Sequence, residues 1–313
     1  MVLGVVTVTF VLIHAAPGDP VDLYLSREME PEARQAVLAS LGLERPLPEQ
    51  YLRWLGGAVR GDLGWSISHH RPVRQVIAER LPLTLQLTLL AFAMQLAAGM
   101  SVGALAAARR GRFAEAVATG GTLILYSLPL FWLAALLIAI FSIQLGWLPS
   151  SGARELIASP QSRAGEIADR ARHLILPVIC LGLGSAAFTA RFVRSGLLTA
   201  LAQDYATAAR SRGAGVSRVL WRHALRNALP PVIASAGLSL PFLFAGSVLV
   251  EQAFSWPGMG SLSVEAVLKR DYPVVLALQM LLAALVVAGS FAADVGLKLA
   301  DPRLREPGHP RAS

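Results

Sequence analysis

The chain has 313 residues, of which 54% are hydrophobic and only 15% are charged. Soluble globular domains carry about 25% charged residues, so this composition excludes an ordinary soluble fold. The net charge of +8 comes from basic residues that gather between apolar segments, and this distribution argues against a nucleic-acid partner.

Six long windows contain no Asp, Glu, Lys or Arg, and they mark the predicted membrane spans. About 20 apolar residues cross the hydrocarbon core of a bilayer as a helix, and five of the windows are long enough. The fourth window is at the short end and reaches this length when His173 and Phe192 are included. The windows are 1–18, 81–108, 116–153, 174–190, 227–250 and 272–293. The sequence therefore predicts an all-α integral membrane protein with six transmembrane helices.

The first predicted helix and the loop after it form one region, residues 1–80. Pro17-Gly-Asp-Pro20 takes the chain out of the membrane in a turn. The loop is too long for a plain connector and contains helical stretches at 31–41 and 48–59, with a turn at 61–64. A signal peptide at the N-terminus is the alternative, but the basic residues expected before its apolar run are missing. We expect the first span to be retained.

Residues 81–300 hold the other five spans and form the predicted core. In the second span, Gly99 and Gly103 are a small-xxx-small pattern that lets helices approach closely. A basic turn at 109–112 leads into a third span over 117–143.

The fourth span contains Pro177, so a kink is expected there. The same span holds Cys180, the one cysteine, which excludes a disulfide within the chain and is expected to be a small buried hydrophobe. After the fifth span, residues 251–269 predict a turn and a short helix at the outer mouth of the membrane region. Residues 301–313 form a tail.

The charge of the loops predicts their sides. If both termini are cytoplasmic, the cytoplasmic segments hold 14 basic and 5 acidic residues, and the opposite segments hold 14 basic and 15 acidic residues. Eight of the outer basic residues lie in the long first loop, which the positive-inside rule discounts. We therefore expect cytoplasmic termini, a long extracytoplasmic loop after the first helix, and a cytoplasmic loop at 195–229 between the fourth and fifth helices.

This cytoplasmic loop contains the most informative local pattern of the chain. Good helix formers dominate residues 200–212, and the glycines at 213 and 215 are typical of a left-handed helix end. Alanines at 206, 208 and 209 give the helix a surface of small side chains against which another protein could pack, and arginines lie at the edge of this surface. A basic surface loop with no further role is the alternative on composition alone.

The whole string adds a resemblance to a known family. Tyr205-Ala-Thr-Ala-Ala-Arg-Ser-Arg-Gly213, then His223-Ala-Leu-Arg-Asn-Ala228, resembles the EAA coupling loop of ATP-binding-cassette importer permeases of the dipeptide/oligopeptide type. Segments that resemble further signatures of this subfamily, in the expected order, are 17–20, 41–46, 60–64, 254–258, 270–273 and 301–305. Thr207 departs from the broader family by standing where its name-giving glutamate lies, and Arg226 replaces a frequent proline.

The resemblance implies a permease subunit in the bacterial cytoplasmic (inner) membrane. Its implied protein partners are a homologous second permease subunit, two ABC ATPase subunits and an extracytoplasmic solute-binding protein that delivers a peptide-like solute. Membrane lipid is a further implied partner. The residues that it assigns to ATPase coupling are Asp204, Tyr205, Thr207, Ala208, Ala209, Arg210, Arg212, Gly213, His223, Arg226 and Asn227.

The sequence also lacks the signatures of several other functions. Neither lysine, Lys269 or Lys298, lies in a phosphate-binding P-loop, so ATP hydrolysis is expected in partner chains. The predicted spans carry no deep ionisable residue of the kind that ion-coupled carriers use. A stand-alone secondary transporter or channel remains the first alternative, and a structural or receptor-like membrane protein is the second. The His69-His70 pair is more typical of an incidental loop pair than of a metal site. No enzyme, cofactor or metal centre is predicted.

Polar residues inside the spans are expected to bond between helices more often than to line a path. They are Gln86, Gln95, Gln144, Gln279, Ser185, Ser239 and Ser247.

Overall fold

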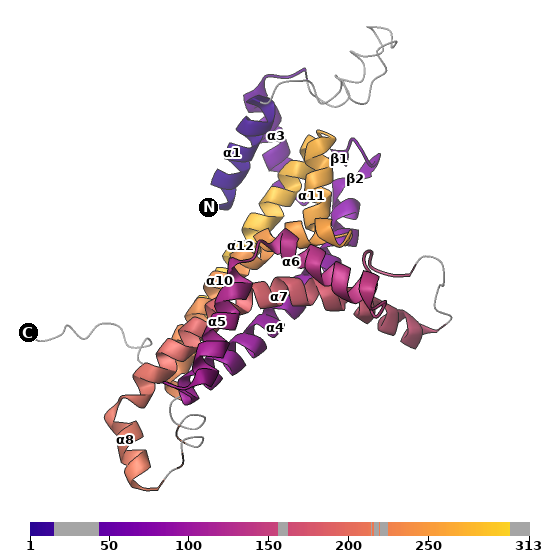
Figure 1. Cartoon of the computed structure of the whole chain (residues 1–313). Helices are drawn as coiled ribbons and strands as arrows, with labels where there is room; N and C mark the ends of the chain where they lie inside the picture. Colours follow the sequence, from indigo (N-terminus) through magenta and orange to yellow (C-terminus); the bar gives the residue numbers. More distant parts are fainter. Residues whose placement is uncertain (16–43, 156–161, 214, 216–218, 220–224, 301–313) are drawn as a thin grey trace, which may run out of the picture. The chain divides into compact units, whose positions relative to one another are not determined.

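The computed structural model describes residues 1–15, 44–155, 162–213, 215, 219 and 225–300 (Figure 1). Apart from one pair of two-residue strands, the regular structure in this part of the chain is helical. It divides into two compact units: unit 1 comprises Met1–Leu85 with Pro257–Val287, and unit 2 comprises Gln86–Trp256 with Ala288–Ser313. The predicted helix at 31–41 and the motifs at 17–20 and 301–305 lie outside the described residues.

Unit 1 combines short helices with the ends of two long ones. Its elements are α1 (Val2–Ala15), α3 (Leu47–Val59), β1 (Trp65–Ser66), β2 (Arg71–Pro72), the start of α4 (Val73–Ala108), α11 (Met259–Leu268) and the start of α12 (Tyr272–Ala300). α1 packs on α3, where the rings of Phe10 and Tyr51 meet edge to face at 5.1 Å. The predicted helix at 48–59 is confirmed as α3, and Gly61 and Gly64 after it have positive φ, as the predicted turn requires.

The core of unit 1 joins parts of the chain that are far apart in sequence. Ten apolar side chains from the start of α4, from α11 and from the start of α12 form one buried cluster. They are Val73, Val76, Ile77, Met259, Leu262, Ala266, Val274, Val275, Ala277 and Leu278. The predicted short helix within 251–269 is therefore present as α11, and the backbone N–H of Met259 in its first turn donates to the Thr84 hydroxyl of α4 at 2.7 Å.

The C-terminus of α11 has an unusual residue at its cap. The backbone N–H of Asp271 donates to the carbonyl of Ala266 at 2.8 Å, and that of Arg270 donates to Val267 at 3.1 Å. This pair of bonds is the Schellman motif, whose left-handed position usually holds glycine. Here it holds Arg270, with φ at +53°. A non-glycine residue in this conformation stores local backbone strain.

Arg270→Gly is expected to raise the free energy of unfolding of the chain by about 1 kcal/mol, because glycine adopts the left-handed conformation without a steric penalty. Thermal unfolding in detergent measures the effect, and Arg270→Ala is the control, since it removes the side chain but keeps the strained φ. A glycine variant no more stable than the alanine variant would contradict the strain argument.

Unit 2 is arranged around one long helix, α7 (Arg163–Leu201), which contacts α5, α6, α8 and α10 (Figure 1). The other elements of the unit are the rest of α4, α5 (Phe113–Ser127), α6 (Leu130–Leu137), the π-helix η2 (Ile138–Gln144), α8 (Asp204–Ser211), α10 (Leu225–Ala253) and the end of α12. A buried cluster of α4 and α7 side chains, with Val232 of α10, fills the space between these helices. α7 passes Pro177 as a continuous helix.

The small-xxx-small pattern of α4 packs directly on α7. A Cβ atom added to Gly99 would lie 2.6 Å from the Cβ of Thr189, and one added to Gly103 would lie 2.6 Å from the carbonyl oxygen of Ala190. Beside this contact, the buried Gln95 donates to the Thr189 hydroxyl at 2.9 Å. The expected interhelical role is thus confirmed for Gln95, whereas Ser239 and Ser247 donate to carbonyls of their own helix.

The predicted third span is broken, which the apolar pattern did not indicate. α5 ends at Ser127, and α6 with η2 continues after a bend of 104°. Leu128 has an extended backbone (φ −78°, ψ 129°), as expected for the residue before Pro129. The span predicted over 117–143 is therefore present as a bent pair of helices and not as one continuous helix.

The described helices include three that are long and apolar enough to cross a membrane: Val73–Ala108, Arg163–Leu201 and Tyr272–Gly296. The bent pair Phe113–Ser127 and Leu130–Gln144 adds a fourth if it counts as one span. Two shorter apolar helical segments correspond to the predicted first and fifth spans. They are Val2–Ala15, which is α1, and Ser239–Ala253, which is the second half of α10. The described part of the chain is thus mostly helical, with three to four candidate spans.

Candidate functional site

The predicted coupling helix is present, but it begins later than expected. α7 runs to Leu201, and a break at Ala202 and Gln203 separates it from α8, so the continuous helix predicted over 200–212 is wrong at its start (Figure 1). Asp204 lies in the first turn of α8, where a carboxylate interacts favourably with the helix dipole. The break lets α8 take a direction of its own at the end of the long helix.

One side of α8 faces its own chain and the other is open. Ala206 is fully buried, so its predicted place on a docking surface is wrong. Ala208 and Ala209 are half-buried, and the exposed residues are Asp204, Tyr205, Thr207, Ser211 and Arg212. The exposed side therefore combines a carboxylate, hydroxyl groups and a guanidinium.

Gly213 ends α8 as predicted. Its φ is +83°, in the left-handed region, and a Cβ atom at this position would meet no atom within 4 Å. Glycine is thus required by backbone conformation and not by space.

Other predicted coupling residues are described only in part. His223 lies outside the described residues, as do the side chains of Arg210, Arg226 and Asn227; the last two lie in the first turn of α10.

A polar contact that the sequence did not reveal ties α7 to the start of α5. The Glu115 carboxylate accepts hydrogen bonds from Arg194 of α7, one of them from Nε at 3.0 Å. Its other oxygen accepts the backbone N–H of Gly111 at 2.7 Å. Gly111, with φ at +76°, closes the predicted basic turn. This contact fixes α7 relative to α5 two turns before α7 ends and the coupling helix begins.

A groove between α5 and α7 lies next to this ion pair. Its volume is about 680 Å³, and its walls include Thr119, Thr122 and Tyr126 from α5, and Phe188, Arg191 and Phe192 from α7. No motif in the sequence marks it, because its residues come from two helices that are over 60 residues apart.

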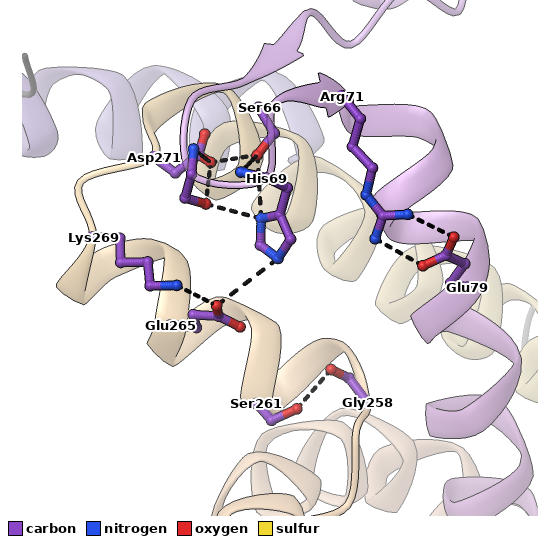
Figure 2. A network of polar contacts seen from close by, with 10 residues as sticks. Ser66, His69, Arg71, Glu79, Gly258, Ser261, Glu265, Lys269 and Asp271 are labelled. Atoms are coloured by element: carbon purple, nitrogen blue, oxygen red, sulfur yellow. Dashed lines mark hydrogen bonds and ion pairs between the residues drawn. The ribbon is translucent and has the colours of Figure 1, made fainter. Parts of the chain in front are cut away.

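Unit 1 contains a second polar cluster, centred on Asp271 (Figure 2). This carboxylate is fully buried, and its Oδ2 accepts the Ser66 hydroxyl at 2.6 Å and, from Ser68, the hydroxyl at 2.7 Å and the backbone N–H at 2.9 Å. The Nδ1 of His69 lies 2.8 Å from the Ser68 hydroxyl. The carboxylate thus holds the loop between β1 and β2 against the end of α11, and His69 belongs to this hydrogen-bonded loop.

Charged groups surround this cluster (Figure 2). Lys269 donates to Glu265 at 2.7 Å, and this hydrogen bond, together with the charges of Lys269 and His69, lowers the pKa of Glu265. Arg71 donates two bonds to Glu79, at 2.7 and 2.8 Å, which raise the pKa of Arg71. The described residues contain no group of three or more His, Cys, Asp or Glu side chains placed to hold a metal ion.

Comparisons with known proteins find family models and relatives that match most of the chain. The family model "Binding-protein-dependent transport system inner membrane component" matches residues 99–306, and a model of the N-terminal part of such membrane components matches residues 1–88. The chain is 40% identical to the oligopeptide transport system permease protein AppB of Bacillus subtilis, over 97% of this chain and 95% of AppB. It is 36% identical to the dipeptide transport system permease protein DppB of Escherichia coli, over 97% and 94%.

A solved structure has a similar fold. An inward-facing structure of the MetNI methionine ABC transporter matches with a TM-score of 0.58, at 21% identity, over 72% of this chain and 97% of that chain. At this identity the likeness concerns the fold alone.

Proposed function

The chain belongs to the family of inner membrane components of binding-protein-dependent transport systems, and from this membership we propose that it forms half of the translocation pore of an ATP-driven peptide importer. The observation that carries the proposal is its similarity to peptide permeases over 97% of its length. ATP hydrolysis lies in other subunits, which agrees with the lack of a P-loop in the sequence. The transported solutes are di- and oligopeptides or peptide-like molecules.

The proposed topology has six spans and two cytoplasmic termini. Four spans correspond to α4, the bent α5–α6 pair, α7 and α12, and the apolar helices Val2–Ala15 and Ser239–Ala253 supply the first and the fifth. The excess of basic over acidic residues in 109–115, 191–229 and the tail supports a cytoplasmic position for these segments. The loop after α1 is then extracytoplasmic.

The proposed partners are a homologous second permease, two ABC ATPase subunits and an extracytoplasmic solute-binding protein. The exposed side of α8, with Asp204, Tyr205, Thr207 and Arg212, is the surface that docks on an ATPase subunit. ATP-driven closure of the two ATPases moves α8, and α7 transmits the movement because it continues without interruption from Leu201 to Arg163. In this way the pore alternates between a state open to the extracytoplasmic side and a state open to the cytoplasm.

The other class of function is a secondary transporter or channel that works alone. Such carriers usually place ionisable residues deep in their spans. The windows 81–108 and 272–293 contain none, which favours a pore whose gating is driven by partner subunits.

Reconstitution tests the proposed function. We expect proteoliposomes that contain this chain with its partner permease, ATPases and binding protein to take up dialanine or trialanine only when ATP is supplied on the ATPase side. Omission of the ATPases is expected to stop uptake. Uptake by the purified chain alone, driven by an ion gradient, would establish a stand-alone carrier instead.

A further inference from the structure

The groove between α5 and α7 has the size of a ligand site. Its volume of about 680 Å³ lies within the range of roughly 300–1,000 Å³ that is typical of small-molecule pockets. Phe188 and Phe192 of α7 and Leu123 of α5 supply apolar walls. The size of the groove and its apolar walls fit a small solute.

The groove contains one positive charge that has no partner among the described residues. Arg194 is paired with Glu115, and the second oxygen of Glu115 is held by the backbone N–H of Gly111. Arg191, one turn earlier on α7, is exposed and has no hydrogen bond or ion pair with any residue in the described part of the chain. A guanidinium that lines a pocket without a partner of its own is available to bind an anion. Its planar arrangement of donors suits a carboxylate.

The polar lining of the groove favours a hydrated solute over a lipid tail. Thr119, Thr122 and Tyr126 recur on one face of α5 at helical spacing and bring three hydroxyl groups to the groove. Val117 and Ile124, which do not line the groove, are exposed and apolar, as expected for residues that face hydrocarbon. The Thr122 hydroxyl already donates to the Thr119 carbonyl at 2.9 Å. An acyl chain in the groove would leave the hydroxyl groups of Thr119 and Tyr126 next to hydrocarbon, whereas a peptide offers them polar partners.

We propose that this groove is a wall of the translocation path and that Arg191 binds the C-terminal carboxylate of the passing peptide. The inference rests on the proposed peptide transport and adds the residue that recognises the solute. The carboxylate is the group that peptides of different sequence share, so one fixed guanidinium and apolar walls serve many of them.

A cysteine placed in the groove tests access and charge directly. In the assembled transporter without nucleotide, Thr122→Cys provides a reactive thiol, because the native Cys180 is fully buried. We expect the sulfonate-bearing methanethiosulfonate to react with it about tenfold faster than the trimethylammonium reagent, because the charge of Arg191 attracts anions. Arg191→Gln is expected to remove this difference, and Arg110→Gln, an exposed arginine outside the groove, is expected to keep it.

Protection distinguishes the occupants. Millimolar dialanine or trialanine is expected to slow the labelling of Thr122→Cys. The C-terminal amides of the same two peptides, which lack the carboxylate, are not expected to slow it. Protection by phosphatidylglycerol but not by either peptide would make the groove a lipid site and overturn the proposal. A thiol that reacts with neither reagent would also overturn it, because a translocation path must admit water.

Uptake completes the test. Arg191→Gln is expected to lower the maximal rate of dialanine and trialanine uptake about tenfold while ATPase stimulation by the binding protein persists, and Arg191→Lys is expected to restore part of the rate. Equal uptake by the Arg191→Gln and wild-type transporters would refute the role of Arg191 but would leave the proposed peptide transport intact. A wild-type transporter that takes up neither peptide would refute the proposed function itself.

Discussion

Gly213→Pro is expected to reduce ATP-dependent uptake by the assembled transporter to background, while the chain remains in the membrane. Proline fixes φ near −65°, whereas Gly213 has a φ of +83° at the end of α8. It also disfavours a helical conformation at the preceding Arg212. The exit from the coupling helix therefore cannot form, and α8 loses its defined position on the ATPase.

The matched control is Gly213→Asn, because asparagine tolerates the left-handed conformation. A side chain at this position meets no atom within 4 Å, so we expect most of the uptake to remain. Arg210→Glu, which reverses a charge of the motif without a change in backbone, is expected to abolish both uptake and ATPase stimulation. Normal transport by both Gly213→Pro and Arg210→Glu would remove the coupling role from this segment.

The second large effect is expected where α4 meets α7. A Cβ atom at Gly103 would lie 2.6 Å from the backbone carbonyl oxygen of Ala190 and 2.8 Å from the Cβ of Val193. A backbone atom and a branched Cβ cannot rotate away, so the two helices must separate. We expect Gly103→Ala to destabilise the chain by about 1–3 kcal/mol and Gly103→Leu to prevent formation of the native bundle.

Gly120 offers a matched control for this contact. It also lies in an apolar helix, α5, but a Cβ atom there would meet nothing within 4 Å. Thermal stability in detergent, followed by size-exclusion chromatography, is expected to fall for Gly103→Ala and to stay near wild type for Gly120→Ala. Equal behaviour of the two variants would show that close approach at Gly103 does not determine helix packing.

The coupling segment was largely predictable because its signals are local. Glycine at 213 and a run of helix formers before it define the end of α8 within a few residues of sequence. The break at Ala202 and Gln203 was not predictable in the same way. Both residues are compatible with a helix, and the turn between α7 and α8 buries Ala206 against the rest of the chain.

The bend in the third predicted span was signalled only in part. Pro129 indicates an interruption of the helix. Its size of 104°, however, depends on the packing of α6 against α7 and α10, which no pattern within 117–143 encodes. A window of apolar residues has the same composition whether the helix is straight or bent.

The contacts that form the two polar clusters could not be predicted because they are not local. Ser66 and Asp271 are 205 residues apart, and Glu115 and Arg194 are 79 apart. One sequence shows that such residues are polar, but not which of them meet. The segment 270–273 was marked by resemblance alone, without any indication that its aspartate is buried.

The bond between Ser66 and Asp271 also has a consequence for biosynthesis. The hairpin of β1 and β2 leaves the ribosome 205 residues before the carboxylate that holds it. At about 5–20 residues per second this interval is about 10–40 seconds. During that time Ser66 and Ser68 remain hydrated, and the apolar side chains at the start of α4 have no partners from α11 or α12. Unit 1 therefore cannot close until its second segment, Pro257–Val287, has been made, and a chain that terminates before Asp271 would expose the open first segment to membrane quality-control proteases.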